Sequence, residues 1–346
     1  MIKQSVSKES DYRGLQIDSS SSLKEFATDR RKYKKKYIDL ERVTDEEDSK
    51  ASVTGRIVET LLFEKDLFDS RFYMSGSSRM PSGNMLKFVN ALYKCTAENE
   101  NNTSFEDCLK EAYKASEYKW TFDKVLEKFN GSDAEIYYRE LLEVKRKGLT
   151  IVTLDDVTNA ERVVQELKTN EFTAPVIRLI EEDNSRYEVL IQYQIDGYEV
   201  DGLKLKSMMD LVVIDHKAKT IQVYDLKVSW SVEGFYTEYY LYRLAYIQAY
   251  LYKEACREIK VRKNLEYYTV LDPKFIVCDS INYFAPLIYA LDGDDMQDAY
   301  NGFEYKGKHF KGVKEIIKDL KWHKETNIWR ISRINYENGG ITPLKR

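Results

Sequence analysis

The spacing of hydrophobic and polar residues predicts a helical first half of the chain and a second half that contains strands. A serine run at 19–22 precedes Leu23 and Phe26, so a helix is expected to begin there with Ser21 or Ser22 as its cap. Further helices are predicted over 53–68, most of 85–166, 238–260 and 312–324. Strands are predicted over 187–194, 209–214, 220–228 and 274–279.

The order of these segments indicates an α+β (or α/β) fold with a small mixed sheet flanked by helices. Asp196 and Gly197 are expected to form a turn after the first strand, and 215–219 to form the next hairpin loop. The whole chain, 1–346, is predicted to be a single domain, because no linker brackets the helical part. Its expected parts are N-terminal helices over 17–72, a helical insertion over about 85–170 and a core over about 185–335.

Composition narrows the class of protein. Apolar residues make up 43% and charged residues 32% of the 346 positions, which suits a globular protein with a core. No apolar run approaches the ~20 residues of a membrane helix, and the polar start has no signal peptide, so no membrane is expected as a partner. The 4 cysteines lie far apart, so neither a disulfide framework nor a zinc ribbon is expected, and a reducing cytoplasm fits.

The charge of the chain is nearly balanced. With 54 basic and 58 acidic residues and a net charge of −4, the chain does not resemble a protein that coats DNA passively. An enzyme that needs only a local basic surface is not excluded. In the densest basic stretch, Arg30, Arg31, Lys34 and Lys35 are candidate contacts to DNA phosphates. The alternative for this stretch is a solvated helix face.

The candidate chemistry lies on two of the predicted strands. Asp225 and Lys227 are two residues apart, so they project from one face, and a paired strand can bring Asp210 beside them. Two carboxylates can bind Mg²⁺, and a lysine can position or deprotonate water in phosphodiester hydrolysis. The alternative is a pair of ordinary charged residues near a strand end, because a short D-x-K pattern often matches by chance. A lysine at a polar strand end is expected to be removable without loss of folding.

The helix predicted after these strands adds a second pattern. Gln248 and Tyr252 are separated by four residues and therefore lie on one helical face, beside an apolar stripe that includes Leu244 and Leu251. Taken alone, the pair is better explained as two polar residues that flank a packed face.

Together these patterns resemble a known family. An Asp on one strand, D-x-K on the next and QxxxY on the following helix look like the RecB-like branch of the PD-(D/E)xK nucleases, and more closely like phage recombination exonucleases of the exonuclease VIII (RecE) type. The resemblance includes the serine-rich segment 17–37 and the helix 55–64, and it covers 15–72 and about 150–335. It implies a restriction-endonuclease-like core and a Mg²⁺-dependent DNA exonuclease, with Mn²⁺ as a substitute metal.

The resemblance also implies roles for single residues. Asp210 and Asp225 would bind the metal, Lys227 would activate water, and Gln248 and Tyr252 would support the DNA end or the metal ligands. Glu59 stands where the family has a histidine, and an ionised carboxylate among Ile57, Val58, Leu61 and Leu62 is costly unless paired or metal-bound. Glu59 is therefore expected to complete the metal site, whereas Glu64 lies about 140° further around the helix. Cysteines at the positions used by iron–sulfur relatives are missing, so no cluster is expected.

The partners implied by the resemblance are DNA, a single-strand annealing protein and, from ring-forming relatives, further copies of the chain. The location would be the host cytoplasm for a phage-encoded protein. Three alternatives stay open at this point. They are a structure- or sequence-selective endonuclease on the same fold, a non-catalytic nuclease-fold protein that binds DNA or assists assembly, and an α+β protein without a nucleic-acid role.

Overall fold

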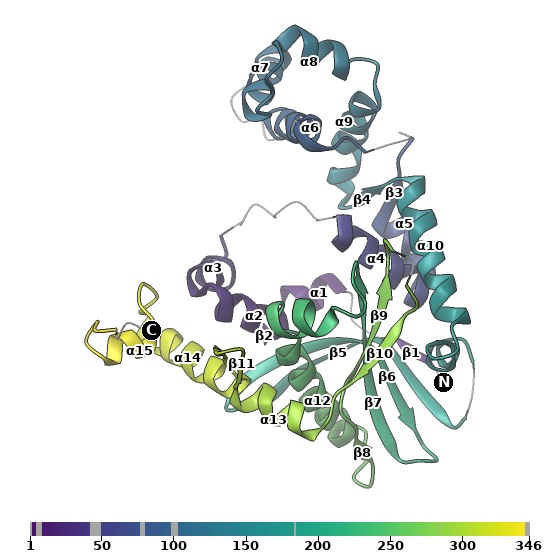
Figure 1. The fold of residues 1–346 in the computed structure, drawn as a ribbon, viewed down its shortest axis with the longest axis vertical. Helices are drawn as coiled ribbons and strands as arrows, with labels where there is room; N and C mark the ends of the chain where they lie inside the picture. Colours follow the sequence, from purple (N-terminus) through teal and green to yellow (C-terminus); the bar gives the residue numbers. More distant parts are fainter. Residues whose placement is uncertain are drawn as a thin grey trace. The chain divides into compact units, whose positions relative to one another are not determined.

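The chain divides into two compact units in the computed structural model, which describes residues 2–4, 9–41, 50–76, 80–97, 103–182, 185–282 and 284–342 (Figure 1). The first unit comprises Met1–Ala51 and Gln165–Arg346, and the second comprises Ser52–Val164. The second unit contains the helices predicted as an insertion together with the helix predicted over 53–68.

A mixed sheet forms the centre of the first unit, and eight described strands contribute to it. Across the sheet follow β1 (Ile2–Gln4), β5 (Tyr187–Val200), β6 (Leu203–Asp215), β7 (Thr220–Ser229), β9 (Lys274–Asp279) and β10 (Leu287–Ala290). Two short strands, β2 (Asp18–Ser19) and β8 (Thr269–Val270), pair with β6 and β7. The β5–β6–β7 meander is antiparallel, whereas β7 and β9 run parallel. A mixed sheet flanked by helices confirms the predicted α+β class.

The four predicted strands are all present, but the turn expected at Asp196 and Gly197 is wrong. β5 continues through both residues to Val200, with a register shift between Asp196 and Tyr198. The hairpin turns instead at Asp201 and Gly202, whose φ angles are 48° and 70°. Gly197 has a φ of 72°, so its backbone freedom serves a bulge inside the strand.

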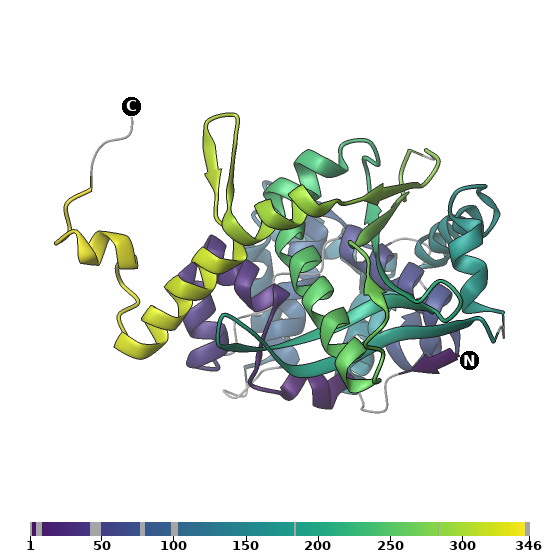
Figure 2. The ribbon, with the colours of Figure 1, turned by 90° about the horizontal axis from the view of Figure 1, so that it is seen from below.

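Helices cover the sheet of the first unit. The parallel pair β7 and β9 requires a crossover, which passes through the π-helix η5 (Tyr236–Tyr242) and α12 (Ala245–Arg262). α12 packs on β5, β6 and β7, and α2 (Ser20–Thr28) packs on α12 and on α14 (Val313–Thr326) (Figure 2). The remaining elements of the unit are α1 (Glu9–Gly14), α3 (Arg30–Tyr33), η1 (Lys34–Ile38), α11 (Ala174–Ile177), η4 (Arg178–Ile180), α13 (Gly293–Asn301), β11 (Phe303–Tyr305), β12 (Lys308–Phe310) and α15 (Arg333–Glu337). Over the described residues, none of the helices is both long and apolar enough to cross a membrane.

The serine run does begin a helix, but its cap is Ser19, two residues before the first candidate, Ser21. Ser19 caps α2 through the backbone amide of Ser22, and the Ser22 hydroxyl accepts the amide of Ser19 in return. Leu23 and Phe26 are buried on the side that faces the core. The helix then breaks at Asp29, which caps the short α3.

The second unit is mostly helical and has its own buried cluster. Its elements are α4 (Lys50–Phe63), η2 (Lys65–Leu67), α5 (Phe68–Arg71), β3 (Phe72–Met74), α6 (Gly83–Ala97), α7 (Phe105–Ala115), α8 (Phe122–Phe129), α9 (Asp133–Val144), η3 (Lys145–Lys147), β4 (Thr150–Val152) and α10 (Leu154–Thr169). Two predictions need correction. The helix expected over 53–68 ends at Phe63, and β4 interrupts the helical stretch by pairing in parallel with β3.

The expectation of no disulfide is wrong for one pair of cysteines. Cys95 near the end of α6 and Cys108 near the start of α7 are joined by a disulfide, with their Cα atoms 5.5 Å apart. The two helices pack on each other, which brings together residues separated by 13 positions. Cys256 and Cys278, which lie in the first unit, are buried free thiols.

Candidate active site

Two aspartates meet on neighbouring strands of the first unit. β6 and β7 pair through Leu211 and Tyr224, and the next residues beyond this pair are Asp210 and Asp225. Because residues opposite each other in an antiparallel pair share one face, the register places the two carboxylates side by side. The backbone amide of Leu226 donates to Asp210 Oδ2 at 2.8 Å, which holds the Asp210 side chain against β7. The structure therefore brings together the two strand aspartates, as the sequence pattern predicted.

Lys227 forms an ion pair with Asp225. The lysine ammonium lies against Asp225 Oδ2, and the two side chains project from one face of β7. Asp225 is only 3% exposed. A buried carboxylate is costly without a partner, so the ammonium is the group that makes its charge tolerable. Oδ2 thus faces the ammonium, whereas Oδ1 accepts a hydrogen bond from Gln248 Nε2 at 2.8 Å.

Gln248 and Tyr252 of α12 face this ion pair. Gln248 Nε2 also lies 2.8 Å from the Tyr252 hydroxyl, and that hydroxyl donates to the backbone carbonyl of Met208 at 2.7 Å. Burial, together with the charge of Asp225, raises the pKa of Tyr252 well above its usual value, so the phenol stays neutral. The QxxxY pair thus links α12 to β6 and β7 and fixes the Asp225 carboxylate in position.

Lys24 is a residue that the sequence patterns missed. It lies on α2, and its Nζ donates to Gln248 Oε1 at 2.9 Å. An ammonium can only donate, so this bond turns Oε1 toward Lys24 and leaves Nε2 to face Asp225. Burial, followed by the nearby charge of Lys227, lowers the pKa of Lys24 to about 7, and Asp225 opposes this shift. No short pattern could have marked Lys24, because its partner is 224 residues away.

Gln192 is a second residue without a sequence signal. It lies in β5 between residues that pair with Leu211 and Met209, and so next to Asp210. Its amide Nε2 is 3.5 Å from Asp210 Oδ1, at the outer limit of a hydrogen bond. Its φ of 44° is in the left-handed region, which is uncommon for a residue other than glycine. Strained backbone of this kind is frequent beside functional sites.

Glu59, the third expected metal ligand, belongs to the second unit. It lies on α4 and is half-buried, and its pairing with Asp210 and Asp225 stays a prediction. Glu64 forms an ion pair with Arg71 inside that unit, 2.6 Å apart. Across the part of the chain that is described, no three His, Cys, Asp or Glu side chains converge closely enough to hold a metal ion. Of the three expected metal ligands, the structure brings together the two on β6 and β7.

The basic stretch begins in α3 and continues through η1. Arg31 and Lys35 are exposed, and Arg30 is tied to two backbone carbonyls of the C-terminal segment. Lys34 is paired with Asp39, with 2.6 Å between its Nζ and Oδ2. The charge of Lys34 is therefore compensated within the chain, and Arg31 Nε lies 3.6 Å from Asp29 Oδ1.

Comparison with known proteins adds little to this picture. No protein-family model and no curated protein matches the chain. Among solved structures, the crystal structure of a "Putative exonuclease" from Eubacterium rectale is similar to 98% of this chain and to 86% of that chain, at 15% sequence identity and a TM-score of 0.44. A likeness this distant carries no argument, so the case for a function depends on the residues themselves.

Proposed function

We propose that the chain is a metal-dependent DNA exonuclease with a PD-(D/E)xK core. The observation that carries the proposal is the buried Asp225 carboxylate, held between Lys227 and Gln248. Asp210 stands beside it on the neighbouring strand. A structural protein gains nothing from burying this arrangement of charges, because an apolar pair of the same volume is often equally stable or better.

The donor atoms fit a hard divalent cation. Mg²⁺ prefers oxygen ligands and is commonly held by one or two protein carboxylates, with water and substrate phosphate completing its shell. Asp225 Oδ2 is buried and faces the Lys227 ammonium, so this oxygen already carries negative charge toward a cation. Asp210 and Asp225 would hold the metal, and Glu59 is proposed as a third ligand. When bound, Mg²⁺ would neutralise developing negative charge and lower the pKa of coordinated water.

The side chains around Asp225 supply the remaining functions of a hydrolase. Lys227 would orient the attacking water, or deprotonate it when in its neutral form, and would stabilise the negative charge on the phosphate oxygens. Gln248 and Tyr252 restrict the Asp225 carboxylate to one orientation, and Lys24 restricts Gln248. Preorganisation of this kind saves the reorganisation that a flexible site would need during the reaction.

The test uses two substrates of the same sequence, an end-labelled linear duplex and a covalently closed circle. With Mg²⁺ or Mn²⁺ the linear duplex should be degraded progressively from its ends and the circle should persist, whereas EDTA or Ca²⁺ should stop degradation. Opening of the circle would favour the endonuclease alternative. Degradation that persists in EDTA, or in the Asp225→Asn variant, would contradict the metal site.

The partners, the biological role and the location of the chain are further proposals. A single-strand annealing protein, association into a homo-oligomer, a role in phage-type recombination and a cytoplasmic location follow from the resemblance alone. Absence of cleavage on both substrates by well-folded protein that still binds DNA would instead favour the non-catalytic alternative.

A further inference from the structure

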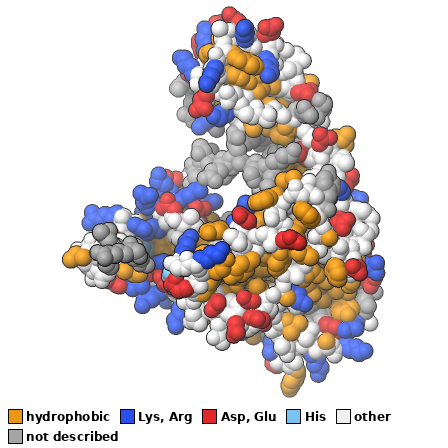
Figure 3. Space-filling view, viewed as in Figure 1, with side chains coloured by type: hydrophobic (Ala, Val, Ile, Leu, Met, Phe, Trp, Pro, Cys, Tyr) orange, Lys and Arg blue, Asp and Glu red, His pale blue; other side chains and the backbone are white. Residues whose placement is uncertain are grey.

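A charged cavity lies at the far end of the helix that carries Lys24. It has a volume of about 300 Å³ and opens in the first unit, where the end of α2 and the start of α3 meet α14 and the segment before α15. Four cationic and two acidic side chains line it: Arg30, Arg31, Lys311, Arg330, Asp29 and Asp319. Figure 3 shows Lys and Arg side chains gathered on the left of the view, where Figure 1 places α3 and the C-terminal helices.

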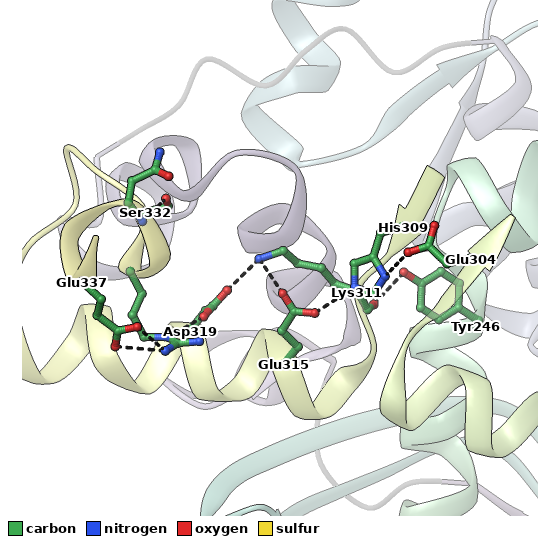
Figure 4. Close-up of polar contacts among 10 residues, drawn as sticks. Tyr246, Glu304, His309, Lys311, Glu315, Asp319, Ser332 and Glu337 are labelled. Carbon is green, nitrogen blue, oxygen red and sulfur yellow. Dashed lines mark hydrogen bonds and ion pairs between the residues drawn. The ribbon is translucent and has the colours of Figure 1, made fainter. Parts of the chain in front are cut away.

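Both carboxylates of the cavity are already compensated. Asp29 Oδ1 accepts two backbone amides of α3, at 2.8 and 3.3 Å. Asp319 binds Lys311 Nζ at 2.7 Å, a contact drawn in Figure 4, and Arg333 Nε at 2.8 Å. Arg31 Nε also lies 3.6 Å from Asp29 Oδ1. The three arginines that line the cavity still carry more positive charge than Asp29 offsets.

These arginines are suited to an oxyanion. Arg30 Nε and Nη2 donate to the backbone carbonyls of Trp329 and Arg330, at 3.0 and 3.4 Å, so its guanidinium is held in one orientation. Arg31 has a side chain that is 75% exposed, and Arg330 is exposed as well. A guanidinium presents a planar fork of donors that matches two phosphate oxygens at once. One guanidinium held by backbone carbonyls and two exposed guanidinium groups around the cavity favour a phosphate group over an apolar ligand.

The cavity and the candidate active site both adjoin α2. Lys24 contacts Gln248 at the site, and Thr28, four residues later on α2, lines the cavity. Four residues of helix span about 6 Å. Phosphates along one strand of B-form duplex recur about every 3.4 Å of the helix axis. A nucleic-acid strand that runs from Asp225 along α2 would therefore present further phosphates toward the arginines.

We propose that this cavity binds a phosphate of the nucleic-acid strand whose cleavage is proposed above. The proposal rests on the function proposed above and names a binding site that the D-x-K and QxxxY patterns do not contain. The bound group could be an internal phosphodiester or a terminal phosphate, since both present the same oxygens to the arginines.

The test is DNA binding measured by fluorescence anisotropy in EDTA, over about 50 to 200 mM salt. The variant Arg31→Gln/Arg330→Gln removes two exposed charges from the cavity. The matched control Lys314→Gln/Lys318→Gln removes two exposed charges from α14 outside the cavity. The cavity variant should bind about tenfold or more weakly, and its salt slope should fall by about 1.8, corresponding to two lost phosphate contacts. The control should stay within about twofold of the wild type.

Oligonucleotides with and without terminal phosphates identify the source of the phosphate. An equal loss of affinity on both supports an internal phosphodiester, and a loss confined to phosphorylated ends supports a terminal phosphate. An unchanged slope in the cavity variant, or an equal loss in the control, would overturn the site. Wild-type protein that binds in this way but never cleaves with Mg²⁺ would contradict the nuclease proposal alone, because EDTA removes turnover from the binding assay.

Discussion

Replacing Lys227 by alanine should both destabilise the protein and stop cleavage. Asp225 is 3% exposed and the Lys227 side chain 21% exposed, so the substitution leaves a buried carboxylate without its cation. Removal of one partner from a buried pair costs about 3–5 kcal/mol. We expect about 3 kcal/mol here, because water reaches the lysine end and Gln248 still donates to the other carboxylate oxygen.

Urea unfolding followed by intrinsic fluorescence measures this loss. The variants needed are Lys227→Ala, Lys227→Met and the double variant Asp225→Asn/Lys227→Met. The double variant should recover most of the lost stability, because a buried amide does not need a cation. Cleavage of linear duplex by Lys227→Ala should fall at least about a hundredfold, the lower range for a group that transfers or positions a proton.

Two results would refute this reasoning. Equal urea midpoints for wild type and Lys227→Ala would mean that the ion pair does not stabilise the fold, and would return Lys227 to the removable strand-end lysine expected from the sequence. Near-normal cleavage by a stable Lys227→Ala variant would contradict the assignment of the D-x-K pattern itself.

Three further predictions concern other parts of the chain. The pKa of Lys24 is lowered to about 7, so between about pH 7 and 10 the folded state binds fewer protons than the unfolded state. The free energy of unfolding should therefore rise with pH over this range, and it should rise less in Lys24→Met. Denaturation of both proteins at several pH values measures the difference. Arg186 lowers the pKa of Asp215 to about 2, so the ionised Asp215 should stabilise the fold above about pH 4 and lose this effect as the pH falls toward 2. In Asp215→Asn, the free energy of unfolding should change less with pH over that window. Alkylation of denatured, unreduced protein should label two cysteines, and prior reduction should expose Cys95 and Cys108 as well; labelling of four without reductant would contradict the disulfide.

The parts of the site that the sequence could predict depend on short-range geometry. Asp225 and Lys227 share a face because side chains alternate along a strand, and Gln248 and Tyr252 share a face because they are four residues apart on a helix. A hairpin with a short loop then fixes the register that brings Asp210 beside Asp225. Each step needs only the local pattern and one turn, so these contacts could be anticipated.

The Cys95–Cys108 pair and the turn after β5 show where local patterns fail. Asp196 and Gly197 have the composition of a turn, but Gly197 equally permits a bulge, and the pairing of β5 with β6 beyond it decides between the two. The cysteines are joined because α6 packs on α7, a contact that depends on the core of the second unit. Composition alone could not distinguish either outcome.

Lys24 shows most clearly why a site cannot be read in full from its motifs. Nothing in the serine-rich segment separates this lysine from the exposed ones that follow it, because its role arises from the packing of α2 on α12. That packing sets an obligate donor against Gln248 Oε1 and thereby selects which amide atom faces Asp225. The motif supplies the carboxylates, the lysine and the amide, whereas Lys24 on α2 orients the amide. Substitutions on α2 are therefore expected to alter the site as strongly as substitutions within the motif.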